Sequence, residues 1–147
     1  MKASFVIGRM IFGGFFLYNA VNHFVNTRKL GQYAGARHVP KPDLAVQAAG
    51  ALMGIGGLSL VLGIKPKYGA AAIVAFLAAV SPSIHAFWAD EDPKAREADM
   101  INFGKNLALL GGALALAAVE EPWPASVPVA RPSIVDRTKT AWRVLAA

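Results

Sequence analysis

Four long apolar stretches constrain what this chain can fold into more than any other feature of its sequence. They cover residues 3–24, 44–64, 68–88 and 101–119, and the only Lys, Arg, Asp or Glu within them are Arg9 and Lys105. An α-helix rises about 1.5 Å per residue and needs about 20 residues to cross a hydrocarbon core of about 30 Å. The sequence therefore predicts an all-α fold, an integral membrane bundle of four transmembrane helices.

The composition supports a multi-pass protein of the cell membrane. Hydrophobic residues make up 55% of the chain and charged residues 16%, against roughly 25% charged in a soluble domain. The net charge is +6, but no basic stripe with interleaved aromatic residues indicates nucleic acid. The expected partner is the lipid bilayer, whose anionic headgroups supply the counter-charge. The absence of cysteine excludes disulfides, thiol redox chemistry and cysteine-ligated iron–sulfur clusters. We predict no metal site.

The connections divide the chain into a four-span domain, residues 1–119, and a tail, residues 120–147. The first stretch is too long and too aromatic for a cleaved signal peptide, so we expect it to be a span. Within the first connection, residues 26–38 are expected to form a short interfacial helix, and residues 89–100 are expected to form an acidic loop. Residues 133–147 form an amphipathic pattern, which predicts a helix lying on the lipid headgroups. A solvated or partner-bound tail is the alternative.

Polar residues gather where the first and third spans end and the fourth begins, toward one membrane surface. Charged groups are costly at bilayer depth, so each of them needs an explanation. The ring carbonyls of a quinone need hydrogen-bond donors, and its tail needs apolar helices. We therefore predict a site for a quinone or another polar head group, formed by His23, His85, Trp88, Lys105 and Asn106.

Other interpretations of the same residues stay open. His and Trp near a span end are commonly interfacial anchors, and Lys105 can extend to the headgroups. The group can also be a structural hydrogen-bond network. Arg9 lies toward the opposite surface, where we expect it to contact lipid or a buried carbonyl. Small residues spaced by four, at 50 and 54 and at 104, 108 and 112, indicate close helix packing within the bundle or between copies.

Several stretches resemble the DoxX family of small four-helix membrane proteins. The resemblance extends over about residues 3–119, and many members carry an acidic residue in the second span where Met53 stands here. It rests on GR at 8–9, IFGG at 11–14, LGQYA at 30–34, VPKP at 39–42, HAFW at 85–88 and FGKNLALLGG at 103–112.

The resemblance implies a link to oxidoreductase systems. Relatives include the membrane part of thiosulfate:quinone oxidoreductases and a component of mycobacterial membrane oxidoreductase complexes. We therefore expect a small membrane subunit of a quinone-linked complex, with no catalytic centre of its own and with other membrane subunits or further copies as partners. A structural or assembly subunit and a small carrier are the alternatives. The sequence leaves open whether the chain is an enzyme. The resemblance carries over Arg9, His85, Trp88, Lys105 and Asn106 as positions of interest.

Overall fold

The computed structural model describes residues 2–128, and within them every regular element is a helix. The helix predicted over residues 133–147 lies outside the described residues. The elements in chain order are α1 (Lys2–Val25), α2 (Thr27–Ala36), α3 (Pro42–Leu62), α4 (Pro66–Ile84), the 3₁₀ helix η1 (Phe87–Ala89) and α5 (Pro93–Ala117).

Proline begins three of the long helices. Pro42, Pro66 and Pro93 each occupy the first turn of their helix, where proline has the φ that a helix needs and its missing N–H loses no bond. Asp92 strengthens the start of α5, because its side chain accepts a hydrogen bond from the Ala95 N–H at 2.8 Å. At the other end of α3, Gly63 adopts a left-handed φ of 68°, which glycine reaches without steric cost.

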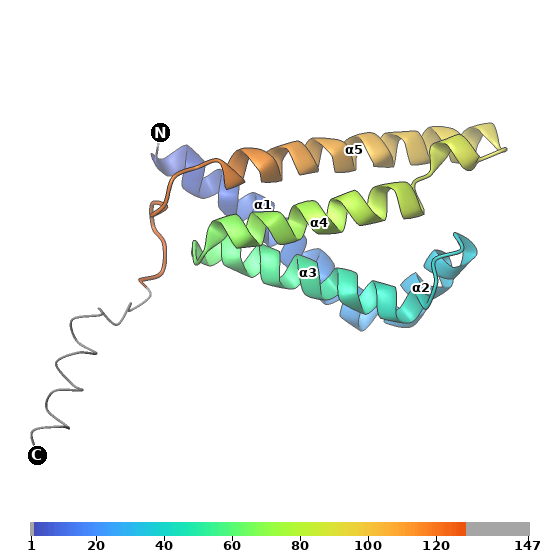
Figure 1. Ribbon diagram of the computed structural model, residues 1–147, viewed down its shortest axis with the longest axis horizontal. Coiled ribbons are helices and arrows are strands. Elements are labelled where there is room, and N and C mark those ends of the chain that lie inside the picture. The colour runs from blue at the N-terminus through green and yellow to red at the C-terminus, as the bar shows by residue number, and fades with distance from the viewer. Residues whose placement is uncertain (1, 129–147) are drawn as a thin grey trace, which may run out of the picture.

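The four long helices lie side by side and run up and down (Figure 1). The N-terminal end of α1, the α3–α4 turn and residues 118–128 lie at one end of the bundle. The helix α2 and the α4–α5 connection lie at the other end, where α4 and α5 diverge from α1 and α3. We call these the turn end and the α2 end. Both carry the polar segments that a membrane-spanning bundle places in the headgroup regions.

Glycine allows the helices to touch backbone to backbone near the turn end. A Cβ built on Gly57 in α3 would lie 2.7 Å from the Gly13 carbonyl oxygen of α1, and a Cβ on Gly13 would lie 2.9 Å from the Gly57 oxygen. Gly56 and Gly69 oppose each other in the same way between α3 and α4, at 2.9 and 3.0 Å. Helices in lipid gain no hydrophobic drive from one another, so such close approach is their main source of packing energy.

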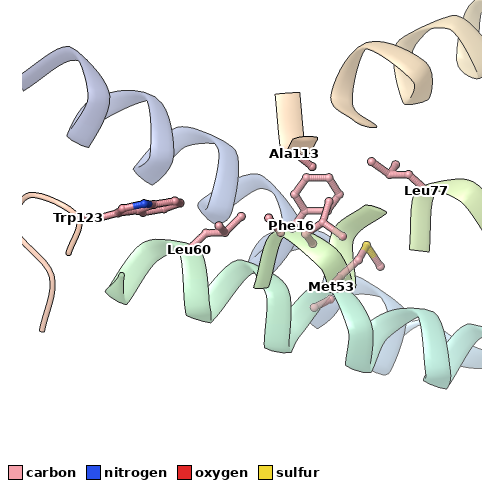
Figure 2. Packing of buried hydrophobic residues seen from close by; sticks show 9 residues of the cluster. Phe16, Met53, Leu60, Leu77, Ala113 and Trp123 are labelled. Carbon is pink, nitrogen blue, oxygen red and sulfur yellow. The ribbon is translucent and has the colours of Figure 1, made fainter. Parts of the chain in front are cut away.

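The apolar core fills the centre of the bundle and continues to the turn end. Figure 2 shows Phe16 of α1 close to Leu77 of α4 and Ala113 of α5, with Met53 of α3 below them. Trp123, from the segment after α5, extends the core at the turn end and is 3% exposed. The segment is therefore part of the packed bundle, and beyond Trp123 the Val127 N–H donates to the Leu62 carbonyl of α3 at 2.9 Å.

The predicted spans are confirmed. Four segments are long and apolar enough to cross a membrane: Ala3–Val25, Pro42–Leu62, Pro66–Ala89 and Pro93–Ala117. The short helix expected within residues 26–38 is α2. The acidic loop expected over residues 89–100 is wrong in its second half, because Asp92 and Pro93 start α5 eight residues earlier than the predicted span.

The glycine contacts lead to a prediction about stability. Gly13→Ala should lower the free energy of unfolding by about 1–3 kcal/mol, because its Cβ has to push two backbones apart. Gly14→Ala is the matched control, since a Cβ on Gly14 meets no other part of the described chain within 4 Å. Unfolding midpoints in detergent would measure both, and equal midpoints for the two variants would contradict the packing argument.

Candidate ligand-binding site

A cavity of about 520 Å³ lies at the α2 end of the bundle. All five α-helices contribute to its walls, which are mainly apolar. Phe15, Met53, Phe76, Leu77 and Leu109 are among the large apolar side chains that line it. Its polar lining consists of Asn19, His23, Tyr33, Ser83, His85 and Asn106. A mainly apolar enclosure with a few fixed polar groups is the usual form of a small-molecule site.

His23 and Asn19 form a local pair on α1. The His23 Nδ1 lies 2.8 Å from the Asn19 main-chain oxygen, one helical turn earlier, and the His23 ring packs edge-on against Phe76 at 6.5 Å between centroids. The Asn19 side chain donates from Nδ2 to the Phe15 carbonyl at 2.8 Å. Both side chains are therefore held by their own helix, and both line the cavity.

His85 belongs to a larger charged network that joins three elements. Its Nδ1 lies 3.0 Å from Asp99 Oδ1, on the first turns of α5. Arg37, which follows α2, places Nη2 2.6 Å from Asp99 Oδ2, an ion-pair contact without hydrogen-bond geometry. Arg37 Nη1 also donates to Asp90 Oδ1 at 2.9 Å. The network thus links the α2 side of the bundle to α4 and α5 beside the cavity.

The charges of this network explain why an arginine holds it together. Asp99 is 3% exposed, and an isolated carboxylate at that burial would be costly. Burial of the Arg37 guanidinium lowers its pKa, but the negative charges of Asp99 and Asp90 and the hydrogen bond to Asp90 outweigh this, and the pKa of Arg37 is raised above its ordinary value. Arg37 therefore remains a permanent cation between two carboxylates.

The structure brings together three of the five residues predicted for the head-group site. His23, His85 and Asn106 line one cavity, whereas Lys105 and Trp88 lie outside that lining. Lys105 is exposed on α5. Trp88 is 57% exposed and packs edge-on against Phe87 and Phe103, a placement suited to the lipid–water boundary.

Arg9 lies far from this cavity, in the turn end. It is 1% exposed, and its Nη2 donates to the Ala125 carbonyl at 2.7 Å while Nη1 reaches the Leu60 carbonyl at 3.4 Å. Its guanidinium also lies 5.9 Å from the Trp123 ring centre. Within residues 2–128 no carboxylate lies at ion-pair distance from it. Arg9 therefore fastens the segment after α5 onto α1 and α3.

Arg37 and Asp99 are not among the site residues predicted from the sequence. Asp99 had a detectable signal, because Asp99, Asn102 and Asn106 follow a helical spacing of three and four residues and share one face. The expected loop over residues 89–100 concealed this spacing. Arg37 had no such signal, since it is one of several basic residues in the first connection.

These features define a class of protein, the small helical membrane proteins with a mainly apolar cavity whose polar groups lie toward one end of the bundle. The DoxX family model matches residues 4–86, more than half of the 147-residue chain, and the chain belongs to this family. The matched part ends in the α4–η1 connection, so the resemblance noted over residues 103–112 lies outside it. No curated protein and no solved structure matches the chain.

Removing the cation of the network should destabilise the protein. Arg37→Ala leaves Asp99 buried without its cationic partner, and we expect a loss of about 2 kcal/mol or more of unfolding free energy. Arg28→Ala, an exposed arginine of α2, is the control. In the double variant Arg37→Ala, Asp99→Asn the loss should be smaller than the sum of the single losses. Additive losses in chemical denaturation would show that the two side chains do not interact.

Proposed function

We propose that this DoxX-family protein is a membrane subunit of a larger oxidoreductase complex and that its cavity binds the ring of a quinone-type lipid. The observation that carries the proposal is the cavity of about 520 Å³, with His23, His85 and Asn106 among otherwise apolar walls. Its size falls within the range of about 300–1,000 Å³ that is typical of small-molecule sites.

The position of the cavity suits an amphipathic lipid. Its polar groups lie toward the α2 end, where a substituted ring would meet the headgroup region. On the facing walls of α3 and α4, Ala48, Ala79 and Ser83 line the cavity and are also exposed. Such small side chains leave room for an apolar tail to pass from the cavity into the surrounding lipid.

The role as a subunit rests on composition and on family resemblance. A bound ring needs an electron donor or acceptor beside it, and a chain without cysteine cannot supply one by thiol or cysteine-ligated cluster chemistry. The resemblance to subunits of membrane oxidoreductases supports a partner as the source of electrons. In this proposal the chain holds the ring and the partner carries out the electron transfer.

Filling the cavity should weaken binding of the ligand. Ala49 lines the cavity, whereas Ala51 is exposed outside that lining. We expect Ala49→Phe to weaken binding of a decyl-substituted benzoquinone about tenfold or more, because the added ring occupies the ligand's space. Ala51→Phe is the matched control. Calorimetric titration in detergent would measure binding, with unfolding midpoints to verify that both variants fold. Equal affinity in the two variants would show that the ligand does not bind in this cavity.

A second candidate function is that of a structural or assembly subunit, and the exposed face of α5 favours it. A Cβ on Gly104 or Gly111 would meet nothing within 4 Å in the described chain, and Ala108 between them is exposed. Small residues on an uncovered transmembrane face permit close approach of another helix. The cavity and this face are at different places, so both functions can belong to one protein.

Enlarging these glycines tests the assembly function. We expect Gly104→Leu with Gly111→Leu to reduce the amount of co-purifying membrane subunits, since the added side chains keep a partner helix at a distance. Gly8→Leu is the control, because Gly8 of α1 also faces open space. Quantitative mass spectrometry of material extracted in mild detergent would compare them. Unchanged composition in the α5 variant would remove the support for a partner on this face.

A further inference from the structure

We propose that the cavity selects the hydroxyl-bearing form of its ring ligand, a hydroquinone, over the corresponding quinone. The inference rests on the proposed function and adds the chemical form that the site prefers. A quinone presents two carbonyl acceptors, whereas a hydroquinone presents two hydroxyl donors. The choice between them depends on whether the polar groups fixed in the cavity wall accept or donate hydrogen bonds.

The two histidines both present acceptors when they are neutral. His85 directs Nδ1 at the Asp99 carboxylate, 3.0 Å away, and an ionised carboxylate only accepts. His23 directs Nδ1 at the main-chain oxygen of Asn19, 2.8 Å away, which also only accepts. Each Nδ1 therefore carries the ring hydrogen, and each neutral ring leaves Nε2 with a free lone pair.

Two other polar side chains of the cavity wall donate hydrogen bonds to carbonyl oxygens of their own helices. The Ser83 hydroxyl donates its hydrogen to the Ala79 carbonyl at 2.7 Å, and the Asn19 amide donates one of its two N–H hydrogens to the Phe15 carbonyl at 2.8 Å. Their oxygens remain as acceptors for a ligand. Asn106 offers both a donor and an acceptor, and Tyr33 is 47% exposed at the edge of the cavity. The balance of the fixed groups is acceptor-rich, which matches hydroxyl donors.

Asp99 is a positioning residue in this scheme, because it sets which nitrogen of His85 faces the ligand. Arg37 contacts both Asp99 and Asp90, and it keeps Asp99 ionised and therefore acceptor-only. The charged and titratable groups around His85 are thus Arg37, Asp90 and Asp99, with His23 and Tyr33 on the remaining cavity walls.

The test compares the two oxidation states of one ligand. The affinities of a decyl-substituted benzoquinone and its hydroquinone, the latter kept reduced without oxygen, are measured by calorimetry at about pH 8.5. We expect the hydroquinone to bind roughly tenfold more tightly, since a carbonyl facing a lone pair leaves both unpaired. In Asp99→Asn the amide can donate to Nδ1 of His85, so the preference should fall. His38→Asn, which alters the histidine outside the cavity lining, should keep it.

Equal affinities of the quinone and the hydroquinone, or tighter binding of the quinone, would overturn the inference while leaving the proposed function in place. Binding of neither form would overturn both. A second measurement needs no ligand. At about pH 8.5, nitrogen-15 spectra of the histidine-labelled protein should show Nδ1–H rings for His23 and His85. The His38→Asn variant identifies the signal of the third histidine, His38. Nε2–H rings at these two positions would overturn the inference even where the hydroquinone binds.

Discussion

The close contact of helix backbones at glycine determines the shape on which the rest of the structure depends. Along α1 and α3 this contact is repeated from Gly13 and Gly57 to Gly50, where a Cβ would lie 3.1 Å from His23 Cβ. Between α3 and α4 it occurs near the turn end, at Gly56 and Gly69. Helices in near contact at one end diverge toward the other (Figure 1). The cavity occupies the space that this divergence opens, so the small residues of the turn end create the site without contacting it.

The separation of the helices at the α2 end is energetically unfavourable, and the charged network reduces this cost. An open α2 end would expose polar groups to lipid and leave α2 without a partner in the α4–α5 pair. Arg37 closes this end by contacting Asp99 and Asp90 beside the cavity. The network contains two carboxylates and one guanidinium, and the neutral His85 ring donates its Nδ1 hydrogen to Asp99. The same groups therefore support the fold and set the proton environment of the one side chain that belongs to both the network and the cavity wall.

The sequence predicted the architecture well because long apolar stretches have few alternatives in a membrane. It also predicted that His23, His85 and Asn106 lie toward one surface, since the number of crossings alone determines that. It did not predict which side chains reach the cavity. Lys105 and Asn106 are neighbours on α5, and the rotation of the helix places only Asn106 inward. That rotation depends on packing partners such as Phe12 against Gly112, and composition does not reveal it. The start of α5 was missed because acidic residues were interpreted as solvated, although Asp92 is a helix cap.

Each end of the bundle contains a buried charged side chain, and the two side chains have different kinds of partner. This difference bears on function. At the turn end, Arg9 is bonded to main-chain oxygens and stacked near Trp123, and these partners have no protonation state that can vary. That arrangement can hold a segment in place and do little else. At the α2 end, the buried charge of Asp99 contacts a histidine whose donor and acceptor roles change with one proton. A ring that gains and loses protons together with electrons needs a neighbour that can both donate and accept hydrogen bonds. His85 at the α2 end meets this need, whereas Arg9 at the turn end does not. The proposed ligand is therefore expected at the α2 end, where His85 belongs both to the network and to the cavity wall.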